Sequence, residues 1–140
     1  MKKMIVVLLL NFWLALIPAM ASPPVEVSIV QLIAASERFD GKLVSVVGFF
    51  QNEMEATAIY LHREDAVQGI RKNGVWVELT PPQIQLASRL NNGYVKIEGV
   101  FSASDHGHFG LWSGSINGVK IISGRVPPPS RKKKNLMRMK

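Results

Sequence analysis

The 140-residue chain contains no cysteine. A disulfide framework and a thiol nucleophile are therefore excluded, and we expect no lipid anchor on an N-terminal cysteine. A domain without cross-links must be held together by packing alone. The 119 residues that follow position 21 suffice for one domain that buries most of its apolar surface.

Basic residues are scarce in the central part of the chain, although the formal net charge is +7. Residues 22–124 hold eight of the 17 Lys and Arg side chains but all 10 Asp and Glu side chains, a balance of −2. A domain that grips phosphates needs a surplus of Lys and Arg along its groove. We therefore disfavour nucleic acid as a partner of this domain.

Recognisable catalytic motifs are also lacking. Ser113 lies in Trp-Ser-Gly-Ser-Ile, which is not the Gly-x-Ser-x-Gly pattern of a nucleophile elbow. Gly107 and Gly110 lack the Lys-Ser/Thr ending and the following helix of a phosphate-binding loop. We therefore expect no enzymatic activity and no cofactor.

The first 21 residues have the three zones of a secretory signal peptide. Two lysines precede an apolar stretch from Ile5 to Ile17, and Ala19 and Ala21 form a small-x-small cleavage pattern. The stretch is shorter than the roughly 20 apolar residues that a bilayer-spanning helix needs. We predict cleavage after Ala21, which leaves Ser22 as the N-terminus of a periplasmic or secreted protein.

Short runs rich in β-branched and aromatic residues predict that most of the mature chain forms β-strands. Residues 111–122 form either one bulged strand or a hairpin around Asn117-Gly118. Gly48 and Gly99 interrupt bulky runs, which is typical of strands that bend in a barrel. The other expected strands are Lys42–Phe50, Ala58–Leu61, Val75–Leu79 and Tyr94–Phe101.

Two helices complete the expected order of elements. The first is predicted from Ser28 to Gly41, with Gln31 completing a capping box, and the second over residues 83–90. Three strands, a helix and one or two further strands match the five-stranded Greek-key barrel of the OB fold. We therefore predict an all-β domain with minor α content, an OB-like barrel over residues 22–124.

Residues 125–140 include three consecutive prolines and many charges, and we predict a disordered basic tail. Basic side chains on such an arm can bind an anionic membrane surface, each contributing on the order of 1 kcal/mol. A solvated end without function is the alternative. The candidate surface-binding residues are Arg131, Lys132, Lys133, Lys134, Arg138 and Lys140.

Several segments between Ser28 and Ile122 carry a resemblance to known sequences. They are residues 39–49, Ile59-Tyr60-Leu61, Glu64-Asp65-Ala66, Gly69-Ile70, Asn73, residues 76–79, 93–95 and 97–101, and Gly107-His108-Phe109-Gly110. Together they resemble a group of small exported bacterial proteins of unknown function. The resemblance implies an OB-like barrel but no activity, because the OB scaffold hosts many unrelated functions.

The side chains best suited to bind a ligand lie in two predicted loops. The candidates are His62 and Arg63 after the second strand, and Asp105, His106 and His108 after the fourth. Three imidazoles would suit zinc or copper, but this spacing alone does not specify a site, and we assign no metal.

Structural roles are the alternative for these residues and for the aromatic side chains. Arg63 and Asp65 can cap a short helix, and His108 and Phe109 can pack their loop onto the barrel. Aromatic side chains on OB strands can stack bases, but we expect most of them to fill the small core. The aromatic residues in question are Tyr60, Trp76, Tyr94, Phe101 and Trp112.

These patterns favour a non-catalytic, exported binding module. We expect a face bounded by the loops near Glu53, His62 and His106 to hold a periplasmic protein, a peptide or a glycan. Two alternatives stay open. One is nucleic-acid binding by the OB domain aided by the basic tail, and the other is metal binding through the three histidines.

Overall fold

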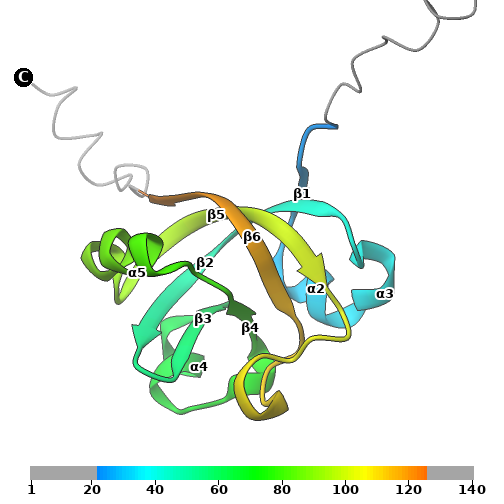
Figure 1. Cartoon of the computed structure of the whole chain (residues 1–140). Coiled ribbons are helices and arrows are strands. Elements are labelled where there is room, and N and C mark those ends of the chain that lie inside the picture. The colour runs from blue at the N-terminus through cyan, green and yellow to red at the C-terminus, as the bar shows by residue number, and fades with distance from the viewer. Residues whose placement is uncertain (1–21, 126–140) are drawn as a thin grey trace, which may run out of the picture.

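A computed structural model describes residues 22–125 (Figure 1). The predicted cleavage site and the six basic residues assigned to surface binding lie outside this range. Within it, no helix is long and apolar enough to cross a membrane. The elements are β1 (Val25–Val27), α2 (Ile29–Ala34), α3 (Ser36–Phe39), β2 (Leu43–Glu53), β3 (Ala56–Tyr60), α4 (Arg63–Val67), η2 (Arg71–Asn73), β4 (Gly74–Val77), α5 (Pro81–Ala87), η3 (Ser88–Leu90), β5 (Gly93–Ser102), η4 (His108–Gly110) and β6 (Ser115–Gly124).

Five strands close into a barrel in the order β2-β3-β4-β6-β5, because β5 also pairs with β2. All neighbouring barrel strands are antiparallel except β4 and β6. This arrangement, with α5 between the third and fourth barrel strands, is that of an OB-like barrel. The predicted all-β class and architecture are confirmed. β1, which the sequence did not predict, pairs in parallel with β2 outside the barrel.

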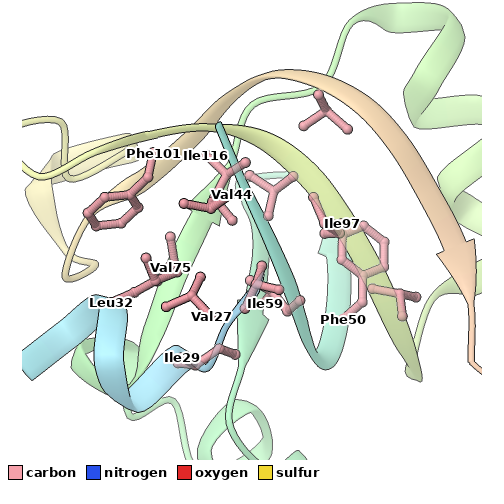
Figure 2. Packing of buried hydrophobic residues seen from close by; sticks show 14 of the residues in the cluster. Val27, Ile29, Leu32, Val44, Phe50, Ile59, Val75, Ile97, Phe101 and Ile116 are labelled. Carbon is pink, nitrogen blue, oxygen red and sulfur yellow. The ribbon is translucent and has the colours of Figure 1, made fainter. Parts of the chain in front are cut away.

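The barrel interior is filled by aliphatic side chains and phenylalanines (Figure 2). Helix α2 adds Ile29 and Leu32 to this core, and α5 adds Ala87. Phe50 and Phe101, on opposite sides of the interior, are fully buried. Removal of this apolar surface from water is the main source of stability, at about 25 cal/mol per Å².

Two glycines lie where the barrel wall is most crowded. A Cβ at Gly48 would lie 2.5 Å from the carbonyl oxygen of Tyr60 and 2.5 Å from Cδ1 of Ile29. A Cβ at Gly99 would lie 2.6 Å from Cγ2 of Ile116. These distances are far below van der Waals contact, so the strands approach closely only because both residues lack a side chain.

Residues 115–124 form one strand, so the bulged strand rather than the hairpin is correct. The register between β5 and β6 shifts beside Gly99, and Gly118 has a φ of 55°. A residue in this left-handed conformation absorbs the extra length of a bulge without ending the strand. Residues 111–114, which the sequence assigned to a strand, belong to the preceding loop instead.

The first helical segment differs from its prediction. The capping box is confirmed, since Ser28 Oγ accepts a hydrogen bond from Gln31 N at 3.2 Å and Gln31 Oε1 accepts one from Ser28 N at 2.9 Å. The single helix expected up to Gly41 is nevertheless wrong. Ala35 has a φ of −139° and divides the segment into α2 and α3.

The helix between β4 and β5 begins earlier than expected. Pro81 lies in its first turn and Thr80 is its N-cap. Proline fits there because the first turn of a helix leaves its N–H groups unpaired. Gln83 Nε2 donates a hydrogen bond to the carbonyl oxygen of Val119 at 2.7 Å, which ties the start of α5 to β6.

β2 and β3 form a longer hairpin than the sequence predicted. β2 continues past Phe50 to Glu53, and β3 begins at Ala56, two residues earlier than expected. Pairing of Glu53 with Ala56 leaves Met54 and Glu55 as the turn. We call residues 53–56 the hairpin tip.

Candidate binding cleft

A second cluster of buried side chains covers the outer face of β2, β3 and β4. Side chains alternate along a strand, so Ile59 points into the barrel while its neighbours Ala58 and Tyr60 point outward. We call this cluster the outer layer. It consists of Phe49, Ala58, Tyr60, Ala66 and Trp112, with Ala56 and Trp76 packed against it.

Trp112 covers the outer layer from the loop between β5 and β6, residues 103–114, which we call the β5–β6 loop. Its indole ring lies 4.9 Å from the Trp76 ring, edge to face, and its Nε1 donates a hydrogen bond to the Tyr60 hydroxyl at 3.2 Å. Burial raises the pKa of Tyr60, so its hydroxyl stays protonated at neutral pH. The pair is therefore uncharged and fully packed.

Lys72 fastens the β5–β6 loop to η2. Its ammonium donates hydrogen bonds to the carbonyl oxygens of Trp112 at 3.1 Å and Gly110 at 3.4 Å. In return, Ser113 Oγ donates to the Lys72 carbonyl oxygen at 2.6 Å. The Arg71 guanidinium lies 5.8 Å from the Trp112 ring. Two successive basic residues thus hold the loop by charge-assisted contacts.

Asp105 organises the same loop from within. Its Oδ1 accepts a hydrogen bond from Gly107 N at 3.0 Å, and its Oδ2 accepts one from Ser115 Oγ at 2.8 Å. The Gly107 N–H, followed by the Ser115 hydroxyl, lowers the pKa of Asp105. Gly107 itself, with a φ of 65°, lies against the Trp76 ring, where a Cβ would come within 2.4 Å of Cγ.

An open cleft of about 440 Å³ lies between the hairpin tip and the β5–β6 loop. The tip forms one wall, residues of the loop form the other, and Trp112 links the cleft to the outer layer. These are the two loops, between the first and second and between the fourth and fifth barrel strands, that OB domains use to bind ligands. The lining residues are Glu53, Met54, Glu55, Ala56, Arg71, His108, Phe109, Leu111 and Trp112.

Two large apolar side chains stand in solvent at the walls of the cleft. Met54 is fully exposed, and Phe109 is 78 % exposed. Phe109 also has a φ of 58°, a left-handed conformation that residues other than glycine seldom adopt. Its ring lies 3.9 Å from that of His108. The backbone of the loop thus presents an aromatic pair to the cleft rather than to the barrel.

The charged groups of the cleft are separated by sign. Glu53 and Glu55 lie on the hairpin tip, and Arg71 lies on the opposite side with His108. Within residues 22–125, the only ion pairs are those of Lys96 with Glu26 and Glu98, on another part of the barrel. The cleft therefore offers two carboxylates and one guanidinium to a ligand.

The structure separates the five predicted ligand-binding residues. His108 lines the cleft, whereas Asp105 is engaged in its own loop and His106 is exposed outside the lining. His62 and Arg63 lie at the start of α4, where Asp65 Oδ2 accepts a hydrogen bond from His62 N at 3.3 Å. The cap expected of Asp65 is present.

No group of three or more His, Asp and Glu side chains in residues 22–125 is arranged to hold a metal ion. Apart from the loop near Glu53 and from His108, the residues that line the cleft were not predicted from the sequence. Arg71 and Trp112 carried no recognisable motif, and Phe109 was assigned to packing. The packing expectation for Phe109 is wrong, because Trp112 covers the barrel in its place.

The aromatic side chains divide between the two faces of the barrel wall. Phe101 fills the interior as expected, but Tyr60 and Trp112 are buried in the outer layer and Tyr94 is 45 % exposed. Three of the five are therefore buried as expected, but only Phe101 fills the barrel interior. Comparison with models of known protein families and with curated protein sequences finds no match to this chain.

Proposed function

We propose that the protein is an exported, non-catalytic OB-type module that binds a peptide segment of a partner protein in this cleft. The observation that carries the proposal is the pair of large apolar side chains, Met54 and Phe109, held in solvent on its two walls. Exposed apolar groups around a concave site are typical of binding surfaces. Methionine adapts its shape to different apolar partners.

The charges of the cleft favour a partner with a particular pattern. An apolar side chain enters between Met54 and Phe109, and a Lys or Arg beside it meets Glu53 and Glu55. Arg71, on the other side, suits a carboxylate or a backbone carbonyl of the peptide. Complementary charges of this kind contribute mainly to specificity and to the rate of association.

The outer layer argues against nucleic acid as the ligand. Bases bind OB surfaces by stacking on exposed aromatic rings along a basic groove. Here Tyr60 and Trp112 are each only 1 % exposed, and the exposed Phe109 shares its cleft with the acidic hairpin tip rather than with a basic groove. A glycan is less favoured than a peptide, because Met54 and Phe109, which stand in solvent on the two walls, are apolar.

Selection of random octapeptides on phage against the mature protein tests the proposal. The Phe109→Asp protein serves for counter-selection, because the Phe109 side chain is exposed and belongs to neither buried cluster. We expect enriched peptides to share an apolar residue next to Lys or Arg, and to lose at least about tenfold in affinity on the Phe109→Asp protein. Equal enrichment on both proteins would contradict the proposal.

Export is tested separately by N-terminal sequencing of protein recovered from a bacterial host. Residues 1–21 have the zones of a signal peptide, so we expect Ser22 as the first residue. Recovery of the chain with Met1 intact from the cytoplasm would overturn this part of the proposal.

A further inference from the structure

The chain leaves the barrel beside the outer layer. β6 ends at Gly124, and the next residue, Arg125, donates its N–H to the carbonyl oxygen of Tyr94 at 2.8 Å. Tyr94 lies opposite Phe49 in the pairing of β5 with β2, and their rings are 5.7 Å apart. Phe49 belongs to the outer layer beneath the cleft. The segment 126–140 therefore starts beside the layer that carries the cleft.

The hairpin tip is within reach of this segment. β2 rises from Phe49 to Glu53 over about 13 Å. An extended chain advances about 3.3 Å per residue, so the length of chain from Arg125 to residues 131–134 is sufficient to span up to roughly 20–30 Å. This span is long enough to cross from Arg125 to β2 and to follow β2 as far as the hairpin tip.

The composition of the segment complements the cleft in the same order. The basic residues Arg131 to Lys134 come first and match the two carboxylates of the hairpin tip. Leu136, Met137 and Met139 follow and match the apolar side chains of the β5–β6 loop, Phe109 and Leu111. Within residues 22–125, neither Glu53 nor Glu55 has an ion-pair partner.

We propose that residues 126–140 dock in the cleft of their own chain and compete there with the partner peptide. This inference rests on the proposed function, since it identifies the regulator of the same site. Covalent attachment within one chain gives the segment an effective concentration near the millimolar range, so even weak contacts suffice. The carboxylate contacts are exposed to solvent, so docking weakens as salt rises.

A spin label tests the docking without any added ligand. The chain has no cysteine, so a nitroxide on the Met139→Cys variant of the mature protein labels one position only. At low salt we expect the amide signals of the hairpin tip and of Phe109 to lose more than about half their intensity, because most molecules are docked. The signals return near 0.5 M salt, where the Debye length falls to about 4 Å.

Charge reversal makes the test specific. Glu53→Lys with Glu55→Lys removes the broadening, and adding Lys132→Glu with Lys133→Glu restores it. The matched control is Glu37→Lys with Glu64→Lys, which changes the net charge equally on α3 and α4 and leaves the broadening intact. Broadening that survives reversal of Glu53 and Glu55 would overturn the proposal.

A mixture of spin-labelled protein and isotope-labelled protein without a nitroxide distinguishes the other occupants. Cleft broadening in the mixture at the level of the single-chain sample identifies the tail of a second copy and overturns docking within one chain. Absence of broadening in both samples also overturns it, and binding of the tail to anionic phospholipid vesicles in that case assigns the segment to a surface.

Peptide affinity separates this inference from the proposed function. Lys132→Gln with Lys133→Gln weakens the competitor, so we expect selected peptides to bind this variant about two- to tenfold tighter than the unchanged protein. Equal affinity would contradict docking of the tail and leave peptide binding intact. Cleft broadening with no peptide selected would contradict peptide binding and leave the docking intact.

Discussion

The barrel interior and the outer layer are built on alternate residues of the same strands, yet they are stabilised in different ways. The interior consists of aliphatic side chains and phenylalanines, whose burial is favourable in any orientation. The outer layer is centred on Trp112 and Tyr60, which are joined by a hydrogen bond. Its cover is a loop fastened by Lys72 and organised by Asp105.

The barrel fold and the geometry of the cleft therefore depend on different kinds of contact. Close packing of apolar side chains fixes the barrel, and its wall has no room for an added side chain at Gly48 or Gly99. Directional contacts to single atoms fix the β5–β6 loop, and with it one wall of the cleft. Substitutions in the wall of the interior should therefore unfold the protein, whereas substitutions beneath the loop should release the cleft wall from an intact barrel.

The largest effect is expected from Gly48→Val and Gly99→Val. Each new side chain meets atoms within 2.6 Å, and at Gly48 one of them is a backbone oxygen that cannot move alone. We expect each variant to lose at least about 4 kcal/mol, above the usual cost of overpacking. Urea unfolding followed by circular dichroism measures the loss. Lys120→Val, exposed on β6, is the control, and a Gly48→Val protein as stable as this control would refute the barrel contact.

Trp112→Ala should have the next largest effect. Replacing a buried tryptophan by alanine costs about 3–5 kcal/mol, and we expect the lower end because the loop can move into the space. The barrel should persist, with native amide signals for β5 and β6 and altered ones for the hairpin tip. Phe101→Ala is the comparison, because it acts on the interior. Loss of all native signals in Trp112→Ala would show that the two regions are not separable.

The sequence was sufficient for the interior because its pattern repeats. Runs of β-branched residues with alternating polar neighbours located the five barrel strands, and Ser28 with Gln31 located the first helix start. Local sequence patterns gave wrong boundaries where contacts between distant residues determine the backbone conformation. Nothing in the residues around Ala35 predicts the break between α2 and α3. The polar Gln51 to Glu53 concealed the extension of the hairpin, since such residues are equally common in loops.

The candidate site was harder to predict for the same reason. Histidines drew attention because their chemistry is versatile, but only His108 lines the cleft. Lys72 contacts the loop across 38 to 40 positions of sequence, and no local pattern indicates such a partner. Phe109 is exposed through its backbone conformation, which the sequence Gly-His-Phe-Gly permits without specifying.

Lys72→Met tests whether the hydrogen bonds from the Lys72 ammonium to the β5–β6 loop contribute to fixing the cleft wall. Two hydrogen bonds to a charged donor are lost, and partial exposure reduces their contribution, so we expect a loss of about 1 kcal/mol. Amide hydrogen exchange should accelerate in residues 110–113 and stay unchanged in β5. Lys42→Met is the control for loss of a lysine. Equal protection of the loop in both variants would mean that the Lys72 ammonium is not needed to hold the loop.

The smallest effect concerns Asp105 and its dependence on pH. Because the native pKa of this carboxyl lies below its ordinary value of 3.8, ionised Asp105 stabilises the folded state. This contribution is complete above the ordinary pKa and is lost as the pH falls through the lower native value. Asp105→Asn should therefore reduce stability at pH 7 by about 1 kcal/mol or less, as expected for loss of charge assistance, and the difference should shrink in acid. A difference that stays constant down to pH 2 would refute the role of the charge.

Ser115→Ala sharpens this last test by removing one donor and keeping the carboxylate. Ser115 Oγ is the second cause of the lowered pKa after the Gly107 N–H, so its loss should raise the pKa of Asp105 toward the ordinary value without restoring it fully. Titration of the Asp105 side-chain carboxyl carbon by NMR measures both values directly, and Ser123→Ala on β6 is the control. An unchanged pKa in Ser115→Ala would mean that the Ser115 hydroxyl does not hold the charge, and would leave the Gly107 N–H and the Asn117 side-chain amide as the donors that do.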